Sequence, residues 1–195
     1  MAWSPLAALT KAQPRVLSYN VASLLRAAPG TVVALPIEVV QLEVAEDVQL
    51  AQPIRGEIRL SRTGRSILAR GDLATAIEGR CSRCLRDIVT PLEVHIEEEA
   101  LPSIDIDTGL PVDVAAEPDA LRLDDHHELD LATPVREAIS LAEPIAALCR
   151  PDCRGLCPTC GLDLNDNPGH DHGEEPIDPR LAALAEWHSA DQTED

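Results

Sequence analysis

The chain has 195 residues, of which 45% are hydrophobic and 26% charged, with a formal net charge of −18. This length can bury a substantial core in one large or two small domains, while the overall acidity argues against loose binding to nucleic acid, which depends on many cations. No apolar run is long enough to span a membrane, and the N-terminus lacks the pattern of a secretory signal, so we expect a cytoplasmic protein with no membrane partner.

The first half of the chain is predicted to be β-rich. Residues 1–30 are expected to form an N-terminal arm with one helical turn near 21–28. Residues 31–100 show the alternation of apolar and polar residues that is typical of antiparallel strands, most clearly over 91–99. Strands are expected at 31–42, 57–62, 66–69, 73–78 and 91–99, with a Cys81-x-x-Cys84 turn at the tip between the last two.

The second half is predicted to contain helices and loops. Residues 101–128 are acidic and are expected to form a mobile linker or long loop. A helix is predicted over 129–142, with Thr133 as its cap, and a shorter one over 178–189. The expected fold class is α+β: a mainly antiparallel β domain with a C-terminal helix, a zinc-bound loop cluster and a short terminal helix. We expect residues 129–190 to pack on the β region as one domain.

Eight residues have the chemistry and spacing of metal ligands: Cys81, Cys84, Cys149, Cys153, Cys157, Cys160, His170 and His172. In a chain that is not exported, such cysteines more often bind metal than form disulfides. Eight ligands fill two closed tetrahedral zinc sites. One pairing joins Cys81 and Cys84 to Cys149 and Cys153; the other places the last four cysteines on one ion. Both pairings predict structural Zn²⁺, either one ion or two.

An arginine-rich zone lies between Arg55 and Arg86, although the chain as a whole is acidic. Residues 1–99 carry 11 basic and 12 acidic residues, and residues 100–195 carry 5 and 22. Candidates for contact with RNA phosphates are Arg55, Arg59, Arg62, Arg65, Arg83 and Arg86. A second interpretation applies near the cysteines, where Arg83, Arg86, Arg150 and Arg154 could instead stabilise zinc-bound thiolates. The chain has two Trp, one Tyr and no Phe, too few aromatics for a base-stacking platform.

Several runs around these ligands resemble the bacterial YceD-like family, the large ribosomal RNA subunit accumulation proteins. The resemblance covers about residues 30–187 and rests on Cys81-Ser82-Arg83-Cys84-Leu85, on Cys153-Arg154-Gly155-Leu156-Cys157-Pro158-Thr159-Cys160-Gly161 and on Asp178-Pro179-Arg180. It implies a non-enzymatic role in ribosome assembly. Some relatives keep ligands that match the Cys81, Cys84, Cys149 and Cys153 set but lack the other cysteine pair, which favours the two-site pairing.

Three functional hypotheses follow. In the leading one, the arginine zone contacts large-subunit ribosomal RNA or a pre-ribosomal particle, and the acidic half contacts a basic ribosomal protein. In the second, the protein is an acidic chaperone of one basic ribosomal protein and touches no RNA. The third is a nuclease or thiol-redox enzyme. The chain has no phosphate-binding loop, dinucleotide motif or nucleophile elbow, so we expect neither an enzyme nor a small-molecule substrate.

Overall fold

The computed structural model describes residues 16–113, 120–173 and 180. The chain divides into two compact units. The sheet unit comprises residues 1–81 and 86–149, and the cluster unit comprises residues 82–85 and 150–195. The four-residue turn 82–85 therefore belongs with the C-terminal segment and not with the strands on either side of it.

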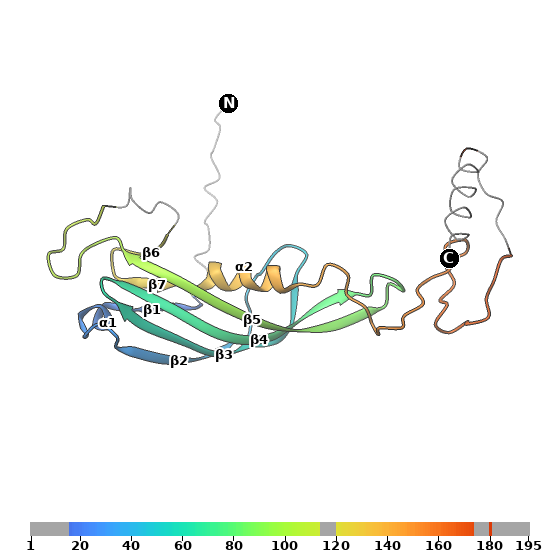
Figure 1. The fold of residues 1–195 in the computed structure, drawn as a ribbon, viewed down its shortest axis with the longest axis horizontal. Coiled ribbons are helices and arrows are strands. Elements are labelled where there is room, and N and C mark those ends of the chain that lie inside the picture. Colours follow the sequence, from blue (N-terminus) through green and yellow to red (C-terminus); the bar gives the residue numbers. More distant parts are fainter. Residues whose placement is uncertain (1–15, 114–119, 174–179, 181–195) are drawn as a thin grey trace, which may run out of the picture. The chain divides into compact units, whose positions relative to one another are not determined.

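The sheet unit is built on a five-stranded sheet of order β2-β3-β4-β5-β6 (Figure 1). Its first four strands are antiparallel neighbours, and the short β6 runs parallel to the end of β5. A two-stranded sheet pairs β1 with β7. The strand bounds are β1 Ser18–Asn20, β2 Val32–Val39, β3 Gln49–Thr63, β4 Ser66–Arg80, β5 Asp87–Pro102, β6 Leu121–Leu123 and β7 Glu128–Asp130.

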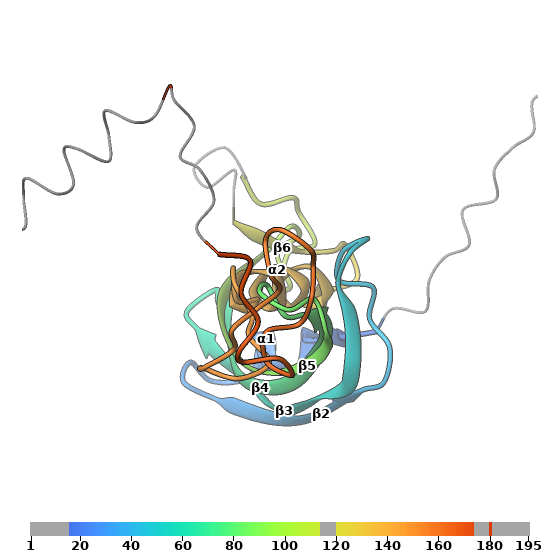
Figure 2. The same ribbon diagram turned by 90° about the vertical axis from the view of Figure 1, so that its right-hand side faces the viewer.

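Alternation along β5 sets the two faces of the sheet, as the sequence predicts. Leu92 and Val94 are buried, whereas Glu93 and His95, which alternate with them, are exposed. Successive side chains of a strand point to opposite faces, so one face of the sheet packs on the core and the other meets solvent. The sheet curves around the helix α2 (Ala132–Ala142), which lies on its inner face (Figure 2).

The helix α2 confirms the predicted C-terminal helix but begins three residues later than expected. Its side chains Val135 and Ile139 are fully buried in the core of the sheet unit. The expectation that Thr133 caps it is wrong, because Leu131 occupies the cap position and forms no side-chain cap bond. Instead the carboxylate of Asp130 accepts the backbone N–H of Ala132 at 2.8 Å.

The two strands predicted at 66–69 and 73–78 are one continuous strand, β4. Gly71 lies at the point where a break was expected. A Cβ atom at this position would lie 2.8 Å from Cγ1 of Ile58 and 3.2 Å from Cγ1 of Ile96. The glycine thus permits close packing of side chains from neighbouring strands, and it does not end the strand.

Two segments predicted as irregular contribute to the core. In the expected linker 101–128, Leu123 of β6 is fully buried, and β5 extends to Pro102. In the expected N-terminal arm, the helix α1 (Ala22–Arg26) matches the predicted turn, and its Leu24 and Leu25 are buried. Both segments therefore take part in the packing of the sheet unit.

The described part of the cluster unit consists of turns and loops. A single bridge joins Leu156 to Asp163, and Gly155 and Gly161 adopt φ values of 78° and 74°. Such positive φ values favour glycine, which lacks the Cβ that would clash there. The helix expected over 178–189 lies outside the described residues, apart from Arg180. Among the helices in the described ranges, none is long and apolar enough to cross a membrane.

Candidate metal centre

The first cysteine pair lies at the tip of the β4–β5 hairpin, as the sequence predicts. The strand β4 ends at Arg80 and β5 begins at Asp87, so the six residues 81–86 connect the two strands and include the turn 82–85. The backbone N–H of Cys81 donates to the carbonyl oxygen of Arg86 at 2.8 Å. Leu85 adopts a positive φ of 59°, which turns the chain sharply after Cys84.

The first cysteine cluster comprises Cys81, Cys84, Cys149 and Cys153. Their four sulfur atoms all lie within 4.8 Å of one another. A tetrahedral zinc ion with Zn–S bonds of about 2.3 Å holds its sulfurs about 3.8 Å apart, so these distances suit one ion. Cys81, Cys84 and Cys153 are at most 5% exposed, whereas Cys149 is exposed.

The second cluster comprises Cys157, Cys160, His170 and His172, whose ligand atoms also lie within 4.8 Å of one another. The sulfur of Cys160 lies 3.2 Å from Nε2 of His170, and Nε2 of His170 lies 2.9 Å from Nε2 of His172. The two imidazole rings meet edge to face with centroids 4.5 Å apart. One nitrogen of each ring therefore points to a common position, which is the arrangement that a shared metal ion requires.

Backbone groups support the thiolate form of Cys157. The backbone N–H groups of Cys160 and Thr159 lower the pKa of the Cys157 thiol, with Cys160 the larger cause and burial opposing the effect. A hydrogen bond to the charged form of a group favours that form. The turn itself is closed by the N–H of Gly161, which donates to the carbonyl oxygen of Cys157 at 2.8 Å. Since the thiolate is the species that binds metal, this turn prepares Cys157 as a ligand.

The eight predicted ligands thus fall into the two groups of the favoured pairing. Four thiolates, or two thiolates with two imidazoles, form donor sets that suit zinc. That these residues bind an ion stays a prediction.

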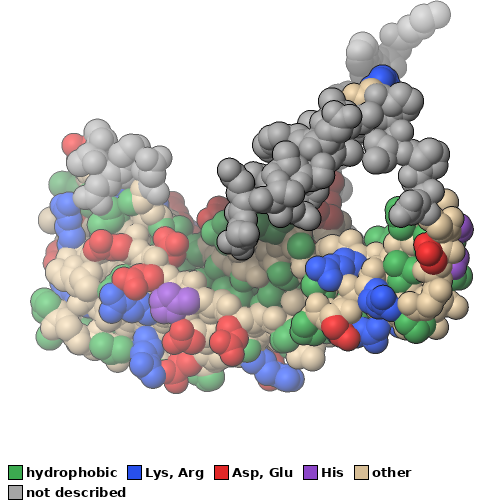
Figure 3. All heavy atoms as spheres, turned by 45° about the vertical axis from the view of Figure 1, so that its right-hand side comes forward, with side chains coloured by type: hydrophobic (Ala, Val, Ile, Leu, Met, Phe, Trp, Pro, Cys, Tyr) green, Lys and Arg blue, Asp and Glu red, His purple; other side chains and the backbone are tan. Residues whose placement is uncertain are grey.

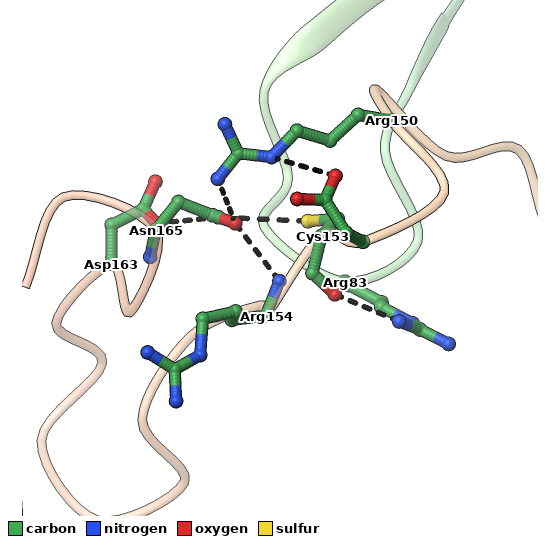
Figure 4. A network of polar contacts seen from close by, with 7 residues as sticks. Arg83, Arg150, Cys153, Arg154, Asp163 and Asn165 are labelled. Atoms are coloured by element: carbon green, nitrogen blue, oxygen red, sulfur yellow. Dashed lines mark hydrogen bonds and ion pairs between the residues drawn. The ribbon is translucent and has the colours of Figure 1, made fainter. Parts of the chain in front are cut away.

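The amide of Asn165 links the loops around Cys153 (Figure 4). Its oxygen accepts hydrogen bonds from the Arg150 guanidinium at 2.8 Å and from the backbone N–H of Arg154 at 2.9 Å. Its nitrogen donates to Asp163 at 2.7 Å and lies 3.5 Å from the sulfur of Cys153. Asn165 was not predicted as a site residue, because a lone asparagine carries no metal-ligand signal.

The turn 82–85 is held against the loop that carries Cys153, within the cluster unit. The Arg83 guanidinium donates to the carbonyl oxygen of Cys153 at 2.8 Å, and the carbonyl oxygen of Arg83 accepts the N–H of Leu156 at 3.2 Å. A Cβ atom on Gly155 would lie 3.1 Å from that same carbonyl oxygen. Gly155 thus allows two backbone segments to approach closely, a role that its place between two ligand cysteines could have suggested.

The predicted RNA-contact arginines of β3 lie in different surroundings. Arg55 and Arg59 are on the outer face of the sheet and pair with Glu38 at 2.9 Å and Glu57 at 2.8 Å. Arg62 instead bonds the carbonyl oxygens of Ala27 and Gly64, so its guanidinium connects backbone segments. Arg65 is exposed at the β3–β4 turn, and Arg83 and Arg86 are exposed at the β4–β5 turn.

A third arginine of the outer face, Arg70, pairs with Glu97 at 2.7 Å. The hydrogen bond from Arg70 lowers the pKa of Glu97 and raises the pKa of Arg70 itself. On the face of the molecule that Figure 3 shows, basic and acidic side chains are interspersed. The sheet arginines therefore do not form an isolated basic patch, because each of Arg55, Arg59 and Arg70 already carries a carboxylate partner.

The fold and the site together define the class of protein to which the chain belongs. Proteins of this class have a mainly antiparallel sheet with a cysteine pair at the tip of its β4–β5 hairpin, and a loop unit rich in cysteine and histidine. Residues 69–186 match the family model described as large ribosomal RNA subunit accumulation protein YceD. The chain belongs to this family. The match covers both clusters and begins within β4, later than the resemblance seen in the sequence alone.

Curated proteins from mycobacteria and maize are similar to this chain. An uncharacterized protein of Mycobacterium tuberculosis is 36% identical over 131 residues, which cover 67% of this chain and 59% of that protein. An uncharacterized protein of Mycobacterium leprae is 29% identical over 169 residues, which cover 84% of this chain and 74% of that protein. The chloroplastic large ribosomal RNA subunit accumulation protein YCED homolog 1 of Zea mays is 45% identical over 38 residues, which cover 20% of this chain and 13% of that protein. No solved structure matches the chain.

Proposed function

We propose that this protein is a non-enzymatic factor in the accumulation of large-subunit ribosomal RNA, and that it associates with this RNA or with a pre-ribosomal particle. The observation that carries the proposal is membership of the YceD family over residues 69–186, a range that contains all eight candidate ligands. The proposal places the protein in the cytoplasm, where bacterial ribosomal subunits are assembled.

The proposal includes two structural zinc ions. The first cluster would hold one ion through four thiolates, and the second would hold another through two thiolates and two imidazoles. Each ion would then have four protein ligands and no position for water or substrate, as is usual for structural zinc. When bound, the ions would supply folding free energy to segments that otherwise consist of loops. This closed coordination supports a binding protein over a nuclease or other metalloenzyme.

Depletion of the protein in its own cells tests the role in ribosome assembly. We expect the ratio of large-subunit to small-subunit ribosomal RNA to fall, and the tagged protein to sediment with particles smaller than the mature large subunit. A variant in which Cys81 and Cys84 are both serine should fail to restore the ratio, while the wild-type gene should restore it. An unchanged ratio after depletion, with the tagged protein at the top of the gradient, would contradict the proposal.

One observation favours a second candidate, an acidic chaperone of a basic ribosomal protein. The outer face of the sheet carries the three paired arginines together with more exposed carboxylates, so this face is acidic overall. The carboxylates are Glu38, Glu57, Asp72, Glu93, Glu97 and Glu99. An acidic face steers a basic partner and repels RNA. A complex with one basic protein that survives ribonuclease would favour this candidate over the leading one.

A further inference from the structure

The arginines of the cluster unit differ from those of the sheet in what they contact. Arg83 donates to the carbonyl oxygen of Cys153 at 2.8 Å, and Arg154 donates to that of Pro168 at 3.0 Å. Both acceptors are neutral. Within the described ranges neither arginine forms an ion pair, whereas Arg55, Arg59 and Arg70 of the sheet each do. The positive charge of Arg83 and Arg154 is therefore not offset by a carboxylate.

Arg150 lies in the same group. It donates to Asn165 at 2.8 Å and lies 3.4 Å from Asp152, whose side chain is 82% exposed. The ion pairs of Arg55, Arg59 and Arg70 are also exposed, but they are shorter, at 2.7–2.9 Å, and are hydrogen-bonded. The longer Arg150–Asp152 pair is screened by salt, so a phosphate could replace its carboxylate at little cost. The backbone of Arg154 is bonded to the same Asn165 oxygen, which connects two of the three arginines through one amide.

These contacts leave donors for a ligand. A guanidinium has five N–H donors in a planar fork that matches phosphate, and the structure gives each of these arginines only one or two acceptors. All three side chains belong to exposed residues. Their loops are fixed by Asn165, by Gly155 and by the bond to Cys153, so little ordering remains to be done on binding.

The contacts also weigh against a purely supporting role at the metal. If the arginines served mainly to neutralise thiolates, their N–H groups would be expected to donate to sulfur. In the described part of the chain, each hydrogen bond of these three arginines goes to an oxygen atom, whereas the amide of Asn165 donates to the Cys153 sulfur.

We infer that the cluster unit provides an RNA-backbone contact, in which Arg83, Arg150 and Arg154 bind phosphates, and that the sheet arginines do not. The inference rests on the proposed function, because it names the surface that would meet the RNA. Backbone contacts of this kind position a protein on RNA without reading its sequence. Specificity for large-subunit RNA would then come from other contacts or from the shape of the RNA.

The test compares two triple variants in zinc-loaded, full-length protein. One changes Arg83, Arg150 and Arg154 to Gln; the matched control changes Arg55, Arg59 and Arg70 to Gln and removes the same charge. The probe is large-subunit ribosomal RNA transcribed in vitro, and affinity is measured by filter binding over a range of salt concentrations. We expect the first variant to bind at least about tenfold more weakly, with a log–log salt slope less negative by about 2 to 3.

The control should differ from the wild type by less than about twofold, since its arginines are hydrogen-bonded to carboxylates on the acidic outer face, which repels RNA. Equal losses in both triple variants, or no loss in the first, would overturn the inference and leave the proposed function standing. Failure of the wild type to bind the RNA at all would overturn the inference, and the depletion experiment then decides separately whether the proposed function stands. Zinc content is measured in every variant, and the double variant R150Q/R154Q keeps the Arg83–Cys153 bond. If binding falls only in variants that lose zinc, the arginines serve the metal site and the inference is wrong.

Discussion

The two clusters are predicted to stabilise the protein unequally, and two serine substitutions can measure the difference. Cys149 of the first cluster and Cys160 of the second are both exposed, so replacing either one removes a candidate ligand without leaving a buried cavity. The substitutions are therefore matched in chemistry and in burial. Each should lower the bound zinc from two ions per chain to one.

The difference arises from the length of chain that each ion would enclose. Residues 84 and 149 are 65 positions apart, whereas residues 160 and 170 are 10 apart. A cross-link restricts the unfolded chain more when it closes a longer loop. The chain-entropy model gives about 4.3 kcal/mol for the first loop and about 2.7 kcal/mol for the second. We therefore expect C149S to be less stable than C160S by about 1.6 kcal/mol.

The assay combines metal analysis with urea unfolding. Zinc is measured by mass spectrometry after dialysis against a weak chelator, and unfolding is followed by far-UV circular dichroism, which reports the strands. The wild type should hold two ions and unfold at the highest urea concentration, followed by C160S and then C149S. Retention of two ions by both variants would refute the ligand assignment. Equal midpoints, or the reverse order, would refute the loop-length argument while leaving the ligands intact.

Three further predictions concern the core, a turn and a carboxylate. Ile58 is fully buried on β3, so Ile58→Ala should lower the free energy of unfolding by about 2–5 kcal/mol in urea titrations, and a change below about 1 kcal/mol would contradict its place in the core. Gly155→Ala should weaken zinc binding more than Gly161→Ala in a chelator competition. Both glycines have positive φ, but of the two only Gly155 has a backbone carbonyl within 4 Å of the added methyl group. Equal effects of the two substitutions would contradict this packing. The backbone N–H and the hydroxyl of Thr108 lower the pKa of Asp105. The Asp105 carboxylate therefore contributes stability above its unfolded-state pKa, and this stability is lost as pH falls through the folded-state pKa. An NMR titration of Thr108→Ala should show the pKa of Asp105 rising towards its ordinary value, and an unchanged pKa would contradict the assignment.

The sequence was sufficient to predict the features that depend on local pattern. Alternation over 91–99 predicted the two faces of β5, and the two strands around Cys81 and Cys84 predicted a hairpin tip. Ligand spacing and count favoured the grouping into two sets of four that the structure brings together. In each case the signal lies within a few residues of the feature, or in the number of ligands that zinc needs.

Features that depend on distant neighbours could not be predicted. Gly71 resembles a strand break until Ile58 and Ile96 are seen to occupy the space beside it. Leu123 lies in an acidic stretch, and its burial depends on β6 pairing with the end of β5. The arginines show the same limit, because pairing across β2 and β3 decides that Arg55 meets Glu38, 17 residues earlier. Composition identified a basic zone but could not show which of its charges were already compensated.

The most direct test of the central claim is recovery of tagged protein from its own cell lysate at near-physiological salt, with and without ribonuclease, followed by analysis of both RNA and protein. We expect large-subunit ribosomal RNA to be recovered with the protein, and the associated ribosomal proteins to be lost after nuclease treatment. Recovery of one small basic protein that survives nuclease, with no ribosomal RNA in either sample, would contradict this claim.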